Sequence, residues 1–223
     1  MTLGVLGGLG PAASCYFYGL LIRHRPVRRD QDHPDVLLYS KASIPDRSAY
    51  LLEEGAQSPL PALVEGLTLL ERMGARAIAV PCATAHHFYP QMQAAVRVPI
   101  PNMLACTASA LRRGRVASAA LLATAGTYRS GAFCRALEAE GVTPLVPGPE
   151  GMRALMEIIY GIKSGEAPVA AALETVAAPL LAQGAQRVIL GCTELSLFAQ
   201  AGLEFPYADP MEILADELLA YCT

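Results

Sequence analysis

Two stretches of this chain are versions of each other, and each carries a cysteine near its end. The first runs from Gly74 to Thr84 (GARAIAVPCAT) and the second from Gly184 to Glu194 (GAQRVILGCTE). In each, a helical pattern precedes a Gly-Ala pair, an apolar run follows, and the cysteine stands eight residues after the glycine. This pattern predicts a helix that ends at the glycine and a buried parallel strand that ends at a thiol. Because ligands bind at the carboxyl ends of such strands, we expect the two thiols to face one ligand from opposite sides.

The order of predicted elements is also the same in both halves of the chain. A buried strand, Leu3–Leu6, leads into a glycine-rich loop, and a second one, Ala119–Ala123, leads into the loop Thr124–Thr127. A helix, another strand and further helices then precede each cysteine stretch. A duplicated α/β unit with right-handed crossovers is the simplest account of this order.

The Pro-rich segment 98–101 marks the predicted crossing between the halves. We predict a first α/β domain of residues 1–98 plus 208–223 and a second of residues 99–207. A final amphipathic helix, Met211–Tyr221, is expected to return to the first domain.

Composition excludes several classes of protein. In 223 residues, 53% are hydrophobic and 17% are charged, which predicts a well-packed globular protein and not a disordered one. The net charge of -3 gives no reason to expect nucleic-acid binding, and the arginines between Arg23 and Arg29 are expected to form a solvated helix end. No signal peptide is visible and the apolar runs are too short to cross a bilayer. We therefore expect a cytoplasmic protein with no membrane partner.

The six cysteines are expected to be thiols in that compartment, and none forms a C-x-x-C pair. Cys82 and His86 have the spacing of two metal ligands but lack a second pair, so we expect no metal. A thiol between a strand and a helix lies beside free N–H groups and a positive helix end, both of which lower its pKa. Cys82 and Cys192 are the functional candidates because their positions match. The other four are expected to serve packing: Cys15, Cys106, Cys134 and Cys222.

Some cofactors are also disfavoured. The run Gly8-Leu9-Gly10 invites comparison with a dinucleotide fingerprint, but Ser40-Lys41-Ala42 stands where that fingerprint needs an acidic residue. We predict instead that this loop lets the backbone approach a small anionic ligand. The chain has only two lysines, Lys41 and Lys163, and neither has a phosphate-binding context, so we expect no pyridoxal phosphate. Arg47 and Lys163 suit carboxylate binding, although spacing alone leaves surface charges as the alternative.

Seven segments together carry a resemblance to a known family. They are Val5–Pro11 (VLGGLGP), Ile44–Ser48 (IPDRS), Val80–Phe88 (VPCATAHHF), Leu121–Gly131 (LLATAGTYRSG), Met156–Gly165 (MEIIYGIKSG), Val188–Leu195 (VILGCTEL) and Asp209–Ala215 (DPMEILA). At these residues the sequence resembles the cofactor-independent aspartate/glutamate racemase family over nearly its full length.

The resemblance implies a fold and a reaction. The fold has two similar Rossmann-like domains with parallel sheets, related by pseudo-twofold symmetry, and an active site in the cleft between them. Cys82 and Cys192 would be the catalytic thiols, one removing the α-proton and the other returning a proton to the opposite face. The expected reaction interconverts L- and D-aspartate, with glutamate as the second candidate. No cofactor is implied, and the chain is expected to form a homodimer.

The resemblance also implies a set of substrate-binding residues. Arg47 and Lys163 match an arginine and a lysine that hold acidic substrate groups in aspartate-type members, and four threonines match donors around the α-carboxylate. The full expected set is Gly8, Leu9, Arg47, Ala83, Thr84, Thr124, Thr127, Lys163, Thr193 and Glu194.

Ala83 departs from the family pattern, which usually reads Cys-Asn-Thr. The missing amide donor is expected to lower turnover or affinity for aspartate. Two alternatives therefore stay open. One is a different enzyme on the same scaffold, such as a maleate isomerase that attacks a double bond with one thiolate, or a decarboxylase, a class that typically keeps a single thiol. The other is a non-catalytic binder of small dicarboxylates.

Overall fold

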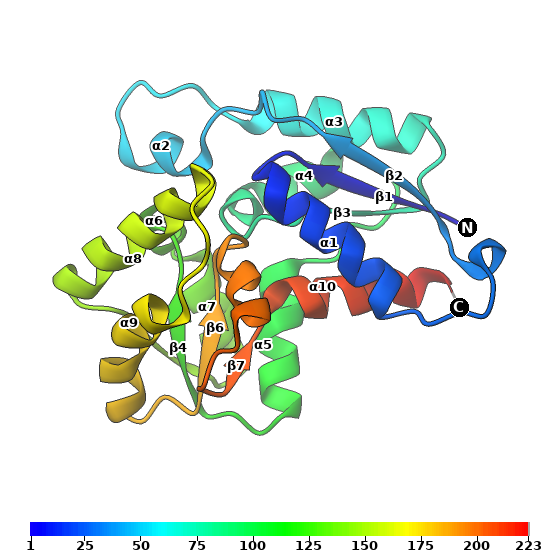
Figure 1. Cartoon of the computed structure of the whole chain (residues 1–223). Coiled ribbons are helices and arrows are strands. Elements are labelled where there is room, and N and C mark those ends of the chain that lie inside the picture. Colours follow the sequence, from blue (N-terminus) through cyan, green and yellow to red (C-terminus); the bar gives the residue numbers. More distant parts are fainter. Residues whose placement is uncertain (223) are drawn as a thin grey trace.

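In the computed structural model, which describes residues 1–222, seven strands form two separate sheets (Figure 1). The first sheet has the order β2-β1-β3, with β1 (Thr2–Gly7), β2 (Asp35–Ser40) and β3 (Ala77–Ala79). The second has the order β5-β4-β6-β7, with β4 (Ser118–Leu122), β5 (Thr143–Leu145), β6 (Arg187–Leu190) and β7 (Tyr207–Ala208). Every pairing is parallel, so the predicted α/β class with parallel sheets is confirmed.

Helices surround both sheets. We call the part of the chain up to Arg113 the first half and the part from Ser118 onward the second half. The first series is α1 (Pro11–Arg23), α2 (Arg47–Leu52), α3 (Leu60–Arg72), α4 (Tyr89–Ala95) and α5 (Met103–Arg113). The second is α6 (Ala125–Ser130), α7 (Ala132–Ala139), α8 (Pro149–Lys163), α9 (Ala170–Ala182) and α10 (Pro210–Leu219). None of the helices within residues 1–222 combines the length and the apolar character that a membrane span requires.

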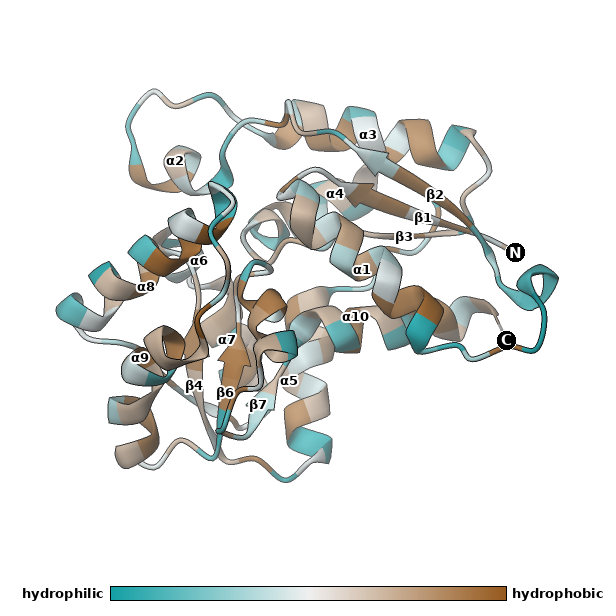
Figure 2. Cartoon of the chain, in the orientation of Figure 1, coloured by the Kyte–Doolittle hydropathy of each residue, from teal (hydrophilic) through white to brown (hydrophobic). Residues whose placement is uncertain are grey.

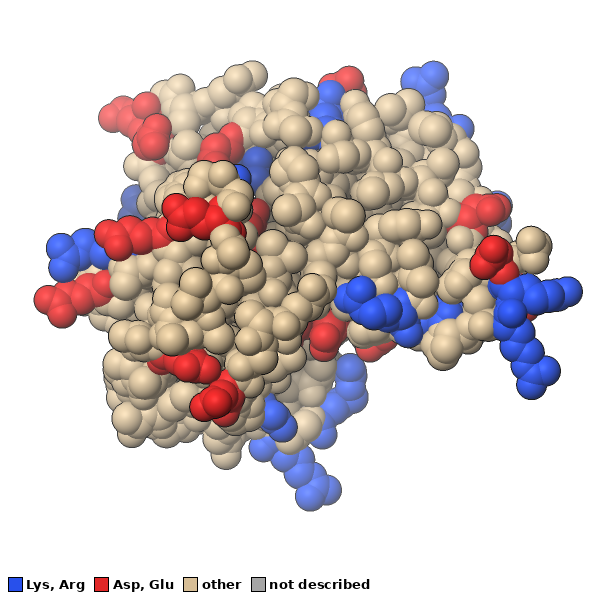
Figure 3. All heavy atoms as spheres, in the orientation of Figure 1, with Lys and Arg blue, Asp and Glu red and all other residues tan. Residues whose placement is uncertain are grey.

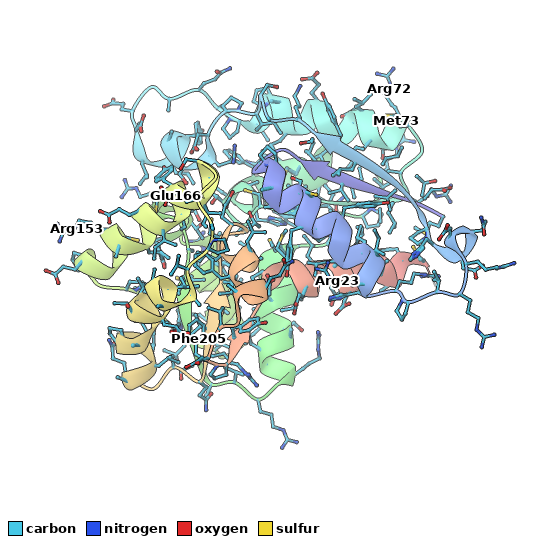
Figure 4. All side chains as sticks on the ribbon, viewed as in Figure 1. Arg23, Arg72, Met73, Arg153, Glu166 and Phe205 are labelled. Atoms are coloured by element: carbon cyan, nitrogen blue, oxygen red, sulfur yellow. The ribbon has the colours of Figure 1, made fainter. Side chains whose placement is uncertain are left out.

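The central strands are apolar along most of their length because helices cover both faces. Leu3, Val5 and Leu6 of β1 and the run 119–122 of β4 are fully buried. Figure 2 shows β1 and β6 in the brown of hydrophobic residues. Charged side chains lie outside: Arg72 and Arg153 point away from the body of the molecule in Figure 4. On the face shown in Figure 3, Lys and Arg side chains lie scattered along the edges.

The glycines of the repeated stretches end the preceding helices as the sequence predicts. Gly74 after α3 has φ +98° and Gly184 after α9 has φ +100°, a left-handed conformation that glycine adopts most readily. The next N–H bonds back to the helix in both cases, from Ala75 to the carbonyl of Leu70 (3.0 Å) and from Ala185 to that of Leu180 (3.1 Å). The two cysteine strands therefore begin in the same way.

The last helix of each half packs against the other half. Before the crossing, the chain runs beside the cysteine strand: the N–H of Ile78 donates to Pro99 (3.0 Å), and that of Val188 donates to Pro206 (2.9 Å). After it, α5 packs against α7 of the second half, while α10 packs against α1 and β3 of the first. The two crossing helices also pack against each other. We propose that these two crossings are the domain boundaries.

The start of the second half differs in one respect from the sequence expectation. Gly131, with φ +65°, separates α6 from α7. The predicted loop 124–127 belongs to the start of α6, because the Thr124 hydroxyl caps that helix by accepting the N–H of Thr127 (3.1 Å). The turns that follow the two cysteines are short 3₁₀ helices, Thr84–Phe88 and Leu195–Ala201.

A buried carboxyl group begins α10. Asp209 is 2% exposed, and its Oδ1 accepts the N–H of Met211 (2.8 Å) and the hydroxyl of Ser196 (2.7 Å). Its Oδ2 is buried with no hydrogen-bond partner. Burial is the main reason that the pKa of Asp209 is raised to about 7. The charge of Glu212 adds to the rise, while the two hydrogen bonds and His24 oppose it. Neutral Asn102 holds the equivalent position before α5, where it accepts the N–H groups of Leu104 and Ala105.

We expect Asp209→Asn to change how stability depends on pH. With a pKa raised from 3.8 to about 7, native Asp209 keeps a proton that the unfolded chain releases, so the free energy of unfolding falls as pH rises through this window. The asparagine can still cap α10 but cannot ionise. Urea denaturation between about pH 5 and about pH 8 should therefore show a smaller loss of stability in the variant than in the wild type.

Asn102→Asp is the matched control for this prediction, because Asn102 is only partly buried and an aspartate there can ionise in water. It should add no loss of stability over the same range. Equal pH slopes for the wild type and Asp209→Asn would contradict the assignment.

Candidate active site

A small cavity lies where the carboxyl ends of the two sheets approach each other. Its lining residues are Leu9, Asp46, Arg47, Ser48, Cys82, Ala83, Thr84, Thr124, Lys163, Gly191, Cys192, Thr193 and Glu194. All of the sequence-predicted site residues are among them except Gly8 and Thr127. Asp46 and Ser48 were missed by the sequence analysis, although both belong to the quoted IPDRS segment and could have been found there. Gly191, which directly precedes the second cysteine, was also missed.

The two candidate thiols occupy equivalent positions. Cys82 follows β3 and Cys192 follows β6, and each is 6% exposed. Each cysteine carbonyl accepts an N–H from three residues later, from Ala85 (3.1 Å) and from Leu195 (2.8 Å), which starts the 3₁₀ turn. The sequence repeat therefore reappears as a repeat in space, with one thiol from each half on the same cavity.

The second thiol has a carboxylate beside it. The Cys192 Sγ–H donates to Oε2 of Glu194 (2.9 Å), and the Thr193 hydroxyl lies 3.4 Å from the same oxygen. Glu194 is 3% exposed, and its Oε1 is buried without a partner. Burial raises the pKa of Cys192 well above its ordinary value, the negative charge of Glu194 raises it further, and Lys163 opposes. The expectation of a lowered thiol pKa is therefore wrong for Cys192, because burial and Glu194 outweigh the helix end.

Two cations face this cavity. Arg47 is buried, so the alternative of a surface charge is excluded for it. Its Nη2 donates to the carbonyl of Leu9 (2.9 Å), its Nη1 donates to those of Ile44 (3.3 Å) and Pro45 (3.1 Å), and its Nε is buried with no partner. Lys163 is the last residue of α8. The side chain of Lys163 is exposed, although it lines the cavity, so the alternative of a surface charge is not excluded for it. Partial burial lowers the pKa of Lys163, but the nearby groups of Cys192, Glu194, Asp46 and Cys82 outweigh this effect and raise it.

Three threonine hydroxyls join the halves on one side of the cavity. The Oγ1 atom of Thr84 lies 3.0 Å from that of Thr124 and 2.9 Å from that of Thr127, and the last two are 3.0 Å apart. Ser48 of the first half also donates to Thr124 (3.3 Å). Thr127 thus lies behind the lining residues, in contact with Thr84 and Thr124. All four side chains are buried, so the hydroxyls satisfy one another.

Ala83 and Gly8 are two predicted site residues without a polar side chain. Ala83 is buried in the apolar cluster that includes Met103 and Ala123. Gly8 lies off the small cavity, and its φ is +86°. A Cβ at Gly8 would clash with the backbone of Lys41 and Ala42. The need for glycine there comes from close backbone packing, and Gly8 lines a neighbouring cavity of about 410 Å³.

The small cavity is nearly closed. Its volume of about 10 Å³ is the space that a single water molecule requires. The neighbouring cavity shares Leu9, Asp46, Arg47, Lys163 and Glu194 with it. The shared residues mark the side on which the two cavities meet.

Residues 1–222 contain no group of three or more His, Cys, Asp or Glu side chains placed to hold a metal ion. His86, which has ligand spacing from Cys82, has both ring nitrogens engaged. Nε2 accepts the N–H of Met103 (3.1 Å), so Nδ1 carries the proton and donates to the carbonyl of Cys82 (3.0 Å). All six cysteines are free thiols.

We expect Glu194→Gln and Lys163→Met to change the reactivity of Cys192 in opposite directions. Removing the negative charge of Glu194 lowers the pKa of Cys192 and speeds its alkylation near neutral pH, while removing the positive charge of Lys163 raises the pKa and slows it. The measurement is the rate of iodoacetamide labelling of the Cys192 peptide, followed by mass spectrometry from about pH 6 to about pH 10.

Glu166→Gln, the same change at an exposed residue just after α8, should leave the rate unchanged. A shift in the same direction for Glu194→Gln and Lys163→Met would contradict the electrostatic account.

Comparisons with known proteins agree with this geometry. The chain matches the model of the Asp/Glu/hydantoin racemase family over residues 6–218. It is 25% identical over 219 residues to the broad specificity amino-acid racemase RacX of Bacillus subtilis. The aligned region covers 96% of this chain and 94% of that protein. Among solved structures, the Picrophilus torridus aspartate racemase is 27% identical with a TM-score of 0.84, covering 99% of this chain and 93% of that one.

An aspartate racemase homologue from Pyrococcus horikoshii OT3 is 26% identical with a TM-score of 0.79, covering 99% of this chain and 98% of that one. The match to the family extends over nearly the whole length and both halves of the fold. This chain belongs to the Asp/Glu/hydantoin racemase family.

Proposed function

We propose that this family member is a cofactor-independent amino-acid racemase that interconverts L- and D-aspartate, with glutamate as the second candidate substrate. The observation that carries the proposal is the pair of buried thiols, Cys82 and Cys192, which line one cavity from equivalent positions of the two halves. Inversion at an α-carbon by proton transfer needs a base on one face and an acid on the other. A duplicated fold with one thiol in each half supplies such an arrangement.

The protonation of Cys192 follows from its surroundings. Cys192 holds its proton in the resting enzyme, because burial and the charge of Glu194 raise its pKa. A thiolate at Cys82 removes the α-proton, and the Cys192 S–H gives its proton to the opposite face of the carbon. One proton thus leaves the substrate and one returns to it, which exchanges the roles of the two sulfurs. The reverse reaction starts from the exchanged state.

The other lining residues bind and orient the substrate. Arg47 and Lys163 provide the positive charge for its carboxylates, and Asp46 and Glu194 line the same cavity as counter-charges. In the closed structure the hydroxyls of Thr84 and Thr124 bond to each other, and a substrate α-carboxylate would take the place of these contacts. Lys163 also offsets the negative charge that develops at the carbon as its proton leaves.

A wider substrate range is the second candidate. Ala83 places a small apolar side chain beside Cys82 where an amide donor for the substrate was expected, and the similar protein from Bacillus subtilis is described as having broad specificity. Maleate isomerisation, decarboxylation and binding without turnover are the remaining alternatives. Each gives a different result in the experiment that follows.

The first test uses proton NMR of each aspartate enantiomer in deuterated water. We expect exchange of the α-proton with inversion, and Cys82→Ala and Cys192→Ala should each lower racemisation by about a hundredfold or more, since each removes the acid or base on one face. Losses below about tenfold would rule out the two-base mechanism. Fumarate formed from maleate, carbon dioxide release, or binding with no exchange would instead support the corresponding alternative.

The second test concerns the two cations. Arg47→Ala and Lys163→Ala should weaken kcat/KM far more for aspartate than for alanine, because an unpaired buried carboxylate costs about 2–5 kcal/mol. Comparing two substrates on one preparation removes the effect of any loss of folded protein. The exposed Arg72→Ala serves as the control, and it should change neither substrate. Equal losses for aspartate and alanine would show that these cations do not recognise the side chain.

A further inference from the structure

The residue four positions after each cysteine is polar and deeply buried, although neither residue lines the cavity. His86 stands four residues after Cys82 and is 3% exposed, and Ser196 stands four residues after Cys192 and is 0% exposed. Their side chains differ in chemistry, yet both connect the turn that carries the thiol to the start of a crossing helix. The proposed reaction gives no role to either residue.

In the first half the connection runs through one ring. His86 donates from Nδ1 to the carbonyl of Cys82 (3.0 Å) and accepts the N–H of Met103, the first residue of α5, at Nε2 (3.1 Å). Burial lowers the pKa of His86, so the ring stays neutral and keeps both roles. The position of Cys82 is thereby fixed to the helix that crosses to the second half.

In the second half the connection runs through two side chains. The Ser196 hydroxyl donates to Oδ1 of Asp209 (2.7 Å), and the same oxygen accepts the N–H of Met211 in the first turn of α10 (2.8 Å). Asp209 therefore combines two tasks that the first half divides between Asn102, which caps α5, and His86, which holds the turn.

We propose that His86, and Ser196 together with Asp209, are positioning residues that set the two thiols separately, each through the crossing helix that follows it. The proposal rests on the proposed function for its catalytic consequence. α5 packs on α7, and α10 packs on α1 and β3. The turn that carries each cysteine is therefore joined by these hydrogen bonds, which we call its tie, to a helix that packs against the opposite half. The two sulfurs keep their places on opposite faces of the substrate only if both ties hold, and a displacement of about 1 Å can cost about a hundredfold in rate.

The first arm of the test needs no activity. Cys82 and Cys192 are labelled with iodoacetamide, and their peptides are quantified by mass spectrometry. His86→Leu should speed the labelling of Cys82 severalfold and leave Cys192 unchanged, while Ser196→Ala and Asp209→Ala should do the reverse. Asn102→Ala, which removes a helix cap without touching either turn, should favour neither thiol. Equal changes at both thiols in His86→Leu or Ser196→Ala would overturn the proposal, since they would indicate general loosening.

The second arm measures primary deuterium isotope effects with α-deuterated L- and D-aspartate. The equilibrium constant of a racemisation is one, so kcat/KM must fall equally for both enantiomers in any variant, but the two isotope effects are free to differ. We expect a loss of about tenfold or more in kcat for Asp209→Ala and for His86→Leu. The isotope effect should rise for one enantiomer of aspartate in Asp209→Ala and for the other enantiomer in His86→Leu. Asp209→Asn, which keeps the acceptor oxygen, should restore both quantities.

The two arms separate the two hypotheses. If the wild type racemises no amino acid, the proposed function fails, and the labelling arm alone still decides whether each tie holds its own thiol. Racemisation in the wild type with unchanged isotope effects in both variants would overturn the positioning role and leave the proposed function standing.

Discussion

The packing of α5 against α10 determines how the two halves face each other. Each helix belongs in sequence to the half that precedes it and in space to the other, so neither sheet can shift without moving a helix of its neighbour. The carboxyl ends of both sheets are thereby held toward one cavity. The thiols, cations and hydroxyls of the site come from both halves, and neither crossing helix contributes a lining residue.

The two thiols have equivalent positions in the fold, but their neighbouring side chains differ. Glu194 stands two residues after Cys192, and the equivalent position after Cys82 holds Thr84. A carboxylate therefore accepts from one sulfur, whereas the hydroxyl at the matching place bonds to Thr124 and Thr127. Glu194 helps to raise the pKa of Cys192. In the proposed reaction, this difference would decide which of the two thiols holds the proton before the substrate reacts.

The cluster of hydroxyl groups lies beside the small cavity, at the boundary between the two halves. Contacts between Thr84 and Thr124 and between Ser48 and Thr124 cross the boundary of the halves, and the space left beside them is that of one water molecule. In the proposed function, the carboxylate oxygens of a substrate would replace some of these contacts.

Sequence alone determined the parallel strands, the glycines that end the helices, and the two thiols, because apolar runs and the left-handed glycine conformation are local properties. It also indicated most of the lining residues through short segments such as IPDRS. The structure alone decided the raised pKa of Cys192, since burial outweighed the local helix end that favoured a lower one. It alone decided the exchange of α5 and α10 and the ties made by His86 and Asp209. These depend on groups far apart in the chain, whose meeting no local pattern specifies, and on how much water each group loses when the halves pack.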